Sequence, residues 1–245
     1  MGDKTIDLYL ALSQQCEIIT QHPNWNHYVL EQTLIACKDI RVEHLWIGAP
    51  GRILQDPCFL VAAQELFELQ QRGQVDQLTL QFHATDQVVV SDAPPILRNF
   101  SLSLIVCESP LCGVDPPRLI IRTYFRMKSL FRSVSLVGSS PLTCIYGVNA
   151  GTGIRRECLV QARLLFVLAT GQVQFCPLGH FSPVGDLASE SLYSILSRYQ
   201  DSHLQFPARH LSNPEASRAN ICAACMGEKQ TEYRRITCKG DQKRV

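Results

Sequence analysis

Apolar positions near the start of the chain repeat with helical spacing. Between residues 5 and 20 they recur about every 3.6 positions, and Asp3 or Thr5 stands where a capping residue is needed. Asn26 can cap a second helix, which is expected to end before a short strand over 42–47. These patterns predict a helical N-terminal region.

The strongest helical pattern lies between Asp56 and Gly73. Asp56 can cap this helix, Pro57 occupies the first helical position, where its missing N–H does no harm, and Gly73 follows the end. The apolar residues between these limits fall on one stripe, made of Phe59, Leu60, Ala63, Leu66 and Phe67. That stripe has to pack against a sheet or other helices.

The period of the apolar pattern changes after this helix and predicts a sheet. Residues 78–82 alternate between apolar and polar, as a half-buried strand requires. Further strands are expected at 88–90 and 102–106, followed by consecutive hairpins between 144 and 176 with a turn at 170–171.

Residues 118–132 fit two patterns. Arg118, Arg122 and Arg126 form a helical i, i+4 row, whereas every second residue of the same segment also fits one face of a strand. The β-branched and aromatic content of the segment, and of residues 133–137 after it, favours a strand.

Together the patterns predict an α+β fold, with a helical N-terminal region packed on a mostly antiparallel sheet and a C-terminal zinc-stabilised segment. The expected regions are residues 1–75 (helical), 76–175 (antiparallel β) and 176–245, all within one compact unit. The last region contains a helix that Asp186 is expected to cap, followed by a Cys/His segment.

Composition and charge limit the class of protein. Of the 245 residues, 46% are hydrophobic and 18% charged, so the chain is expected to fold. A net charge of +1 excludes a globally basic nucleic-acid coat and leaves local patches possible. The longest apolar run, 164–169, is too short to span a bilayer. Because the N-terminus lacks the pattern of a signal peptide, we expect a cytoplasmic or nuclear protein in a reducing compartment.

The cysteines suggest a metal site. Eleven cysteines, an odd number in a chain without a secretory signal, favour free thiols and metal ligands over disulfides. A Cys-x3-His pair and a Cys-x2-Cys pair supply four ligands for a tetrahedral zinc ion, namely Cys176, His180, Cys222 and Cys225. Alternative ligands are His210 and Cys238. Four protein ligands leave no open position, so the predicted zinc is structural.

Two basic clusters are candidate contact regions for nucleic acid or another partner. Their members are Arg118, Arg122, Arg126, Lys128 and Arg132 in the first, and Arg234, Arg235, Lys239, Lys243 and Arg244 in the second. The first cluster is interleaved with aromatic residues, which could stack on bases. The alternative is an ordinary solvated face whose arginines pair with nearby acids.

No catalytic set stands at an interpretable spacing. The glycines between 147 and 153 lack the Gly-Lys-Ser/Thr ending of a phosphate loop. His83-Ala84-Thr85 and His210-Leu211-Ser212 resemble the paired His-x-Thr/Ser signature of 2H phosphoesterases, which implies two histidines acting as acid and base. The second motif departs from that family, because it lies in a segment containing Pro and Asn instead of a strand.

The functional hypothesis from sequence is therefore a non-enzymatic, zinc-stabilised adaptor that binds other proteins through its surface and its C-terminal segment. The first alternative is a nucleic-acid-binding protein that uses the basic clusters 118–132 and 234–244. The second alternative is a 2H-type phosphodiesterase-like hydrolase.

Overall fold

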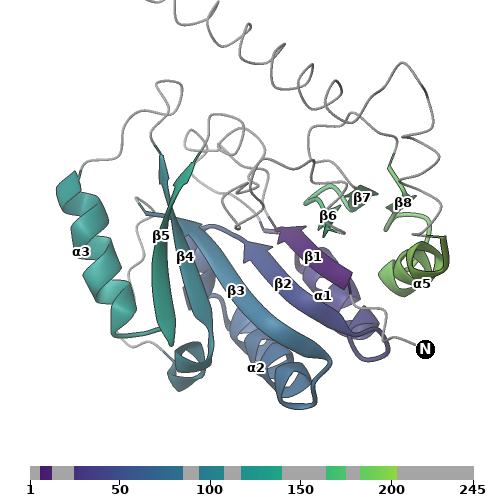
Figure 1. The fold of residues 1–245 in the computed structure, drawn as a ribbon, viewed down its shortest axis with the longest axis horizontal. Helices are drawn as coiled ribbons and strands as arrows, with labels where there is room; N and C mark the ends of the chain where they lie inside the picture. Colours follow the sequence, from purple (N-terminus) through teal and green to yellow (C-terminus); the bar gives the residue numbers. More distant parts are fainter. Residues whose placement is uncertain are drawn as a thin grey trace, which may run out of the picture.

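A single sheet organises the described part of the chain (Figure 1). The computed structural model describes residues 6–12, 25–84, 94–107, 117–139, 164–174 and 183–202. Within these ranges eight strands lie in the order β5-β4-β3-β2-β1-β6-β7-β8. The strands are Ile6–Ala11 (β1), Val42–Gly48 (β2), Val75–His83 (β3), Ser101–Cys107 (β4), Ser133–Ser139 (β5), Leu164–Val167 (β6), Gln172–Gln174 (β7) and Gly185–Asp186 (β8).

Along the chain, a helix stands between most pairs of consecutive strands. The α-helices are His27–Ala36 (α1), Pro57–Gln71 (α2), Pro117–Lys128 (α3) and Leu192–Ser202 (α5). Two short 3-10 helices, Gly51–Gln55 (η1) and Pro95–Asn99 (η2), precede α2 and β4. No helix within the described ranges is both long enough and apolar enough to cross a bilayer.

The prediction of a mostly antiparallel sheet is wrong, although the mixture of helices with a sheet is confirmed. The neighbouring strands from β5 through to β6 all run parallel, and only β6–β7 and β7–β8 are antiparallel. Parallel neighbours need a crossover connection, which helices commonly provide, whereas antiparallel neighbours can be joined by a tight turn. The predicted hairpin with its turn at 170–171 is accordingly found between β6 and β7.

The helix predicted over residues 5–20 is replaced by β1 where the structure describes it. Ile6, Leu8, Tyr9, Leu10 and Leu12 are all buried, because β1 lies between β2 and β6 and both of its faces are covered. Strands buried on both faces have nearly continuous apolar runs instead of a clean alternation. Such a run also fits the spacing of a helix, which explains why a helix was predicted. Residues 13–20 of the predicted helix lie outside the described ranges.

The strand predicted over 118–132 is likewise wrong, because residues 117–128 form α3. Pro117 is its first residue, and Thr123 and Met127, four positions apart, are buried. Basic residues occupy much of the outer side of the helix. The i, i+4 row of arginines was therefore the correct signal in this segment.

The predicted caps of α1 and α2 are confirmed. The Asn26 side chain accepts a hydrogen bond from the Val29 amide (3.3 Å), and Asp56 accepts one from the Cys58 amide (2.8 Å). Gly73, just after α2, has a left-handed φ of 72°, which glycine adopts without steric cost.

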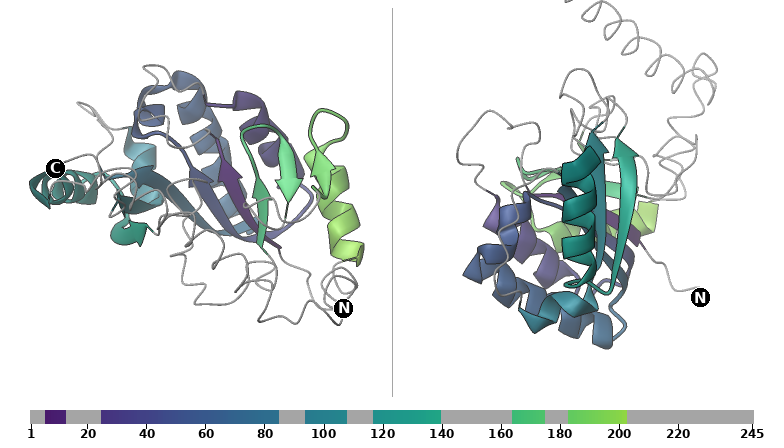
Figure 2. Two further views of the ribbon diagram at one scale, coloured as in Figure 1. Left: turned by 90° about the horizontal axis from the view of Figure 1, so that it is seen from above. Right: turned by 90° about the vertical axis from the view of Figure 1, so that its left-hand side faces the viewer.

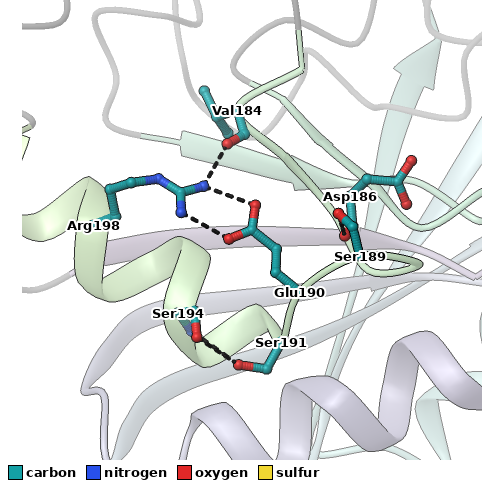
Figure 3. A network of polar contacts seen from close by, with 7 residues as sticks. All are labelled: Val184, Asp186, Ser189, Glu190, Ser191, Ser194 and Arg198. Carbon is teal, nitrogen blue, oxygen red and sulfur yellow. Dashed lines mark hydrogen bonds and ion pairs between the residues drawn. The ribbon is translucent and has the colours of Figure 1, made fainter.

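The start of α5 differs from the prediction, and the polar contacts around it are shown in Figure 3. Asp186 lies in β8. At the start of the helix, the hydroxyl of Ser191 accepts a hydrogen bond from the backbone amide of Ser194 (3.2 Å). Arg198 of α5 donates to both carboxylate oxygens of Glu190 (2.7 and 2.9 Å) and to the carbonyl of Val184 (2.9 Å). These bonds fasten α5 to the segment around β8.

The main core lies between the sheet and the helices α1 and α2, which cover one face (Figure 2). Leu10, Ile47 and Leu80 are paired across β1, β2 and β3, and they share one buried cluster with Leu30 of α1 and Leu66 of α2. Burial of each such side chain contributes about 1.5–3 kcal/mol. The opposite face of the sheet is chemically different.

Candidate functional site

The face of the sheet opposite α1 and α2 carries uncharged polar side chains on four parallel strands. Because side chains alternate between faces, the residues between the core leucines of β2 to β5 point to this side. We call the following set the polar face: His44, Thr79, Gln81, Ser101, Ser103, Ser133 and Ser135. On β1, β2 and β6 the same face is apolar, with a cluster of Tyr9, Ala11, Trp46, Leu164 and Phe166.

Serine hydroxyls on β4 and β5 form two bonded pairs. Ser133 donates to Ser101 (2.9 Å), and Ser103 and Ser135 share a bond of 3.1 Å. Each pair is directly opposed in the parallel register, and parallel strands lie about 4.8 Å apart, so these short side chains meet. The serine side chains are more exposed on β5 than on β4, since Ser103 is buried and both serines of β5 are exposed.

A histidine continues the row on β2. The His44 ring stacks on Trp46, with ring centroids 3.5 Å apart, and its Nε2 lies 2.9 Å from the Thr79 hydroxyl of β3. Burial lowers the pKa of His44 to about 4, and the nearby charge of Glu43 opposes that shift only in part. His44 is therefore neutral at physiological pH and acts as a hydrogen-bonding group.

Tyr9 and Gln81 form a buried polar pair across β2. The Tyr9 hydroxyl donates to Oε1 of Gln81 (2.9 Å), although β2 separates the two strands that carry them. Gly48 of β2 makes this reach possible, because a Cβ at that position would collide with the Tyr9 hydroxyl. Burial raises the pKa of Tyr9 well above its ordinary value, so this phenol stays protonated and serves as a donor.

A cavity opens at the amino-terminal ends of β3, β4 and β5. It measures about 350 Å³, within the usual range of small-molecule pockets. Thr79, Ser101 and Ser133 of the polar face line it. The rest of its lining consists of Gln70, Asp76, Gln77, Leu78, Asn99 and Arg132. A second cavity of about 530 Å³ adjoins it. The two cavities share Gln70, Asp76, Asn99 and Arg132, and Arg98 joins the lining of the second.

The charges around these cavities are unequally neutralised. Asp76 accepts two hydrogen bonds of 3.1 Å from Arg41, so its negative charge is already compensated. Arg98 and Arg132 form no ion pair with any residue in the described ranges. The mouth of the cavities therefore has two exposed guanidinium groups beside a neutral, hydroxyl-rich wall.

The structure separates the first predicted basic cluster into two parts. Arg118, Arg122, Arg126 and Lys128 lie on α3, and Arg132, which follows the helix, lines both cavities. Arg234 and Arg235 of the second cluster lie outside the described ranges. Whether either cluster contacts a partner remains a prediction.

The predicted zinc ligands also lie outside the described ranges. These residues are Cys176, His180, Cys222 and Cys225, with the alternatives His210 and Cys238. In the ranges that are described, no group of three or more His, Cys, Asp or Glu side chains is arranged to hold a metal. Of the two motifs that resemble 2H phosphoesterases, only His83 and Ala84 of the first lie within the described ranges, with His83 as the last residue of β3.

Sequence analysis missed the serines, although they leave a visible signal. Residues 101–104 read Ser-Leu-Ser-Leu and residues 133–136 read Ser-Val-Ser-Leu, so two strands share one alternation of serine with an aliphatic residue. Alternation of this kind, repeated at matching positions, is what two neighbouring strands with one polar face require. The pairing itself could not be inferred without the strand order.

Comparison with known proteins gives a structural match and no sequence family. No protein-family model matches the chain, and no curated protein matches it significantly. The crystal structure of BtrN in complex with AdoMet and 2-DOIA is similar with a TM-score of 0.45 and 13% identity, covering 81% of this chain and 86% of that one. Selenomethionine-substituted BtrN in an open conformation gives 0.42 and 10%, covering 82% and 86%.

The hypothesis of a non-enzymatic adaptor is contradicted by this comparison. The matching chains are those of BtrN, which in one crystal holds two small molecules, AdoMet and 2-DOIA. The adaptor hypothesis rested mainly on the absence of a recognisable catalytic motif, and a site assembled from single side chains on several strands leaves no such motif in the sequence. Because both TM-scores are below 0.5, the likeness identifies no ligand for the present chain.

Proposed function

We propose that the chain binds a small polyhydroxylated molecule bearing one anionic group, such as a phosphorylated or carboxylated polyol. The single observation that carries this proposal is the polar pocket at the ends of β3 to β5, which joins a neutral wall of hydroxyl groups to exposed arginines. The geometry supports binding at this site, with the polyol against the wall and the anion at the mouth.

The neutral wall suits a ligand with several hydroxyl groups. Thr79, Ser101 and Ser133 each offer a hydroxyl that can both donate and accept. They lie side by side on three adjacent strands, so a chain of ligand hydroxyls could follow the row. A rigid sheet holds them in place, which reduces the entropy lost on binding.

The arginines suit the anionic end of the ligand. A guanidinium presents several N–H donors in a plane and pairs with phosphate or carboxylate oxygens through two parallel bonds. Arg132 lines both cavities, so it stands where the two parts of such a ligand would meet. Arg98 and Asn99 supply further donors in the larger cavity.

His44 is expected to position the wall without exchanging protons with a ligand. Its lowered pKa makes it a weak base at neutral pH, and its Nε2 already faces the Thr79 hydroxyl. Depending on its tautomer, the ring fixes whether Thr79 donates to a ligand or accepts from it.

Isothermal titration calorimetry with glycerol 3-phosphate tests the proposal, with glycerol and inorganic phosphate as the two half-ligands. We expect glycerol 3-phosphate to bind more tightly than either half. Arg132→Gln should weaken binding about tenfold or more, because a hydrogen bond to a charged group contributes about 1.5–3 kcal/mol. Ser133→Ala should weaken it less, by about twofold to tenfold, because a neutral hydrogen bond contributes about 0.5–1.5 kcal/mol.

Arg122→Gln is the matched control, because it removes the same charge from an exposed position on α3 outside the cavities. The proposal fails if Arg132→Gln and Arg122→Gln titrate alike. It also fails if a panel of phosphorylated and carboxylated polyols gives no heat of binding with the unaltered chain.

For the C-terminal segment we keep the proposal of a structural zinc ion held by Cys176, His180, Cys222 and Cys225. Its support is the spacing of the two pairs in the sequence.

A further inference from the structure

Helix α3 presents apolar side chains to solvent on its outer side. Phe125 is 65% exposed and Ile121 54%. Thr123 and Met127, on the opposite side of the helix, are buried. The helix is thus held to the sheet by one side, and its outer apolar residues are not needed for that packing.

The same region is strongly basic. Residues 117–139 contain four arginines and one lysine, and no aspartate or glutamate. Arg118, Arg122 and Lys128 are exposed on α3 itself. Exposed apolar residues flanked by cations on one helix are typical of helices that lie on the surface of a membrane.

The position of α3 leaves this side accessible. The helix stands at the outer end of the sheet, beside β5, with α1 and α2 further along (Figure 1). Leu136 of the edge strand β5 is 47% exposed as well. At 12 residues, α3 is too short to span a bilayer, so it could only lie along its surface.

Charge decides between possible partners of this surface. In a symmetric dimer through α3 the arginines of one copy would face those of the other, and like charges in contact disfavour association. An anionic surface has no such penalty. On a bilayer the apolar side chains can enter the interface while the long arginine side chains remain at the level of the headgroups.

We propose that α3 docks the protein on anionic lipid bilayers, with Ile121 and Phe125 inserted and Arg118 and Arg122 against lipid phosphates. The proposal is independent of the polar pocket, because no α3 residue lines either cavity described above. Attraction to anionic lipid contributes about 1 kcal/mol per cation near the surface, which corresponds to about fivefold in partitioning.

Co-sedimentation with vesicles tests this proposal. We expect the full chain to pellet with vesicles of phosphatidylcholine mixed with phosphatidylglycerol, and to remain in the supernatant with phosphatidylcholine alone. Arg122→Ser should reduce binding about fivefold, and Phe125→Ser about tenfold, because one inserted aromatic side chain is lost. Matched controls are Arg72→Ser, directly after α2, and Val61→Ser on α2, which remove an exposed cation and an exposed apolar side chain elsewhere.

Three outcomes would overturn the proposal. The first is no binding to the mixed vesicles. The second is binding that Phe125→Ser leaves unchanged, which would indicate adsorption by charge alone. The third is complete competition by soluble polyglutamate or an oligonucleotide at equal charge, which would identify a polyanion as the partner. Since the substituted residues are largely exposed, thermal unfolding should confirm that every variant is folded.

Discussion

Gly48→Ala should destabilise the protein through a single collision. An added Cβ would meet the Tyr9 hydroxyl and would lie 3.1 Å from Cζ and 3.3 Å from a ring carbon next to it. The ring is fully buried, with Phe166 beside it at a centroid distance of 5.8 Å, so it has little room to move. Relief of the collision has to pull the hydroxyl away from Gln81.

The magnitude follows from two costs. Overpacking a well-packed region costs about 1–3 kcal/mol. Separating the Tyr9 hydroxyl from the buried Gln81 amide leaves polar groups unsatisfied, which costs about another 1–3 kcal/mol. We therefore expect the free energy of unfolding to fall by about 2–6 kcal/mol, measured by urea denaturation.

Two further variants make the explanation testable. Tyr9→Phe alone should cost about 1–2 kcal/mol, since Gln81 loses its donor. When both changes are combined, the total should be smaller than the sum of the single effects, because the colliding atom is then absent. Gly73→Ala is the contrasting control: no atom lies within 4 Å of the added Cβ, so its cost comes from the φ of 72° alone and should be about 1 kcal/mol. A stable Gly48→Ala variant, or strictly additive effects, would refute the reasoning.

Three other predictions concern protonation and metal binding. Because burial holds the pKa of His44 at about 4 against an ordinary value of 6.5, the unfolded chain takes up the proton first, so stability should fall as pH drops from 6.5 toward 4. Urea unfolding at stepped pH should show a flatter dependence for His44→Gln, and an unchanged slope would contradict the assignment. Arg198 lowers the pKa of Glu190, so this pair stabilises the fold above the ordinary pKa of 4.5 and loses its effect as pH falls through the lowered value. Glu190→Gln should lower the unfolding free energy at neutral pH by about 0.5–1 kcal/mol, and no loss in thermal unfolding would show that the exposed pair contributes nothing. Elemental analysis should find one zinc per chain, and a Cys222→Ser, Cys225→Ser double variant should lose it; a metal content unaffected by these changes would rule out the predicted ligands.

Local signals in the sequence determined some elements correctly. Helix α2 was predictable because its start and end are encoded by the residues at its ends, Asp56, Pro57 and Gly73. The hairpin of β6 and β7 was predictable because its turn is short and includes Gly171, which has a positive φ. In each case the information lies within a few residues of the feature.

Elements that depend on distant partners were not predictable in the same way. Residues 6–12 are apolar at enough positions to fit the period of a helix or that of a strand. Their strand conformation results from pairing with β2 and with β6, far away in the sequence. The polar pocket depends on the same information. Thr79, Ser101 and Ser133 are separated in sequence and meet only because β3, β4 and β5 are neighbours.

The order of the strands also constrains how the polypeptide can be made. β1 begins at Ile6 and is translated long before one of its two neighbours, β6, which begins only at Leu164. Until that point in translation, a highly apolar strand has one row of backbone groups without its native partner, which makes the growing chain prone to aggregation. We therefore expect synthesis of this protein to rely on chaperones that shield β1, and fragments ending before Leu164 to accumulate in inclusion bodies.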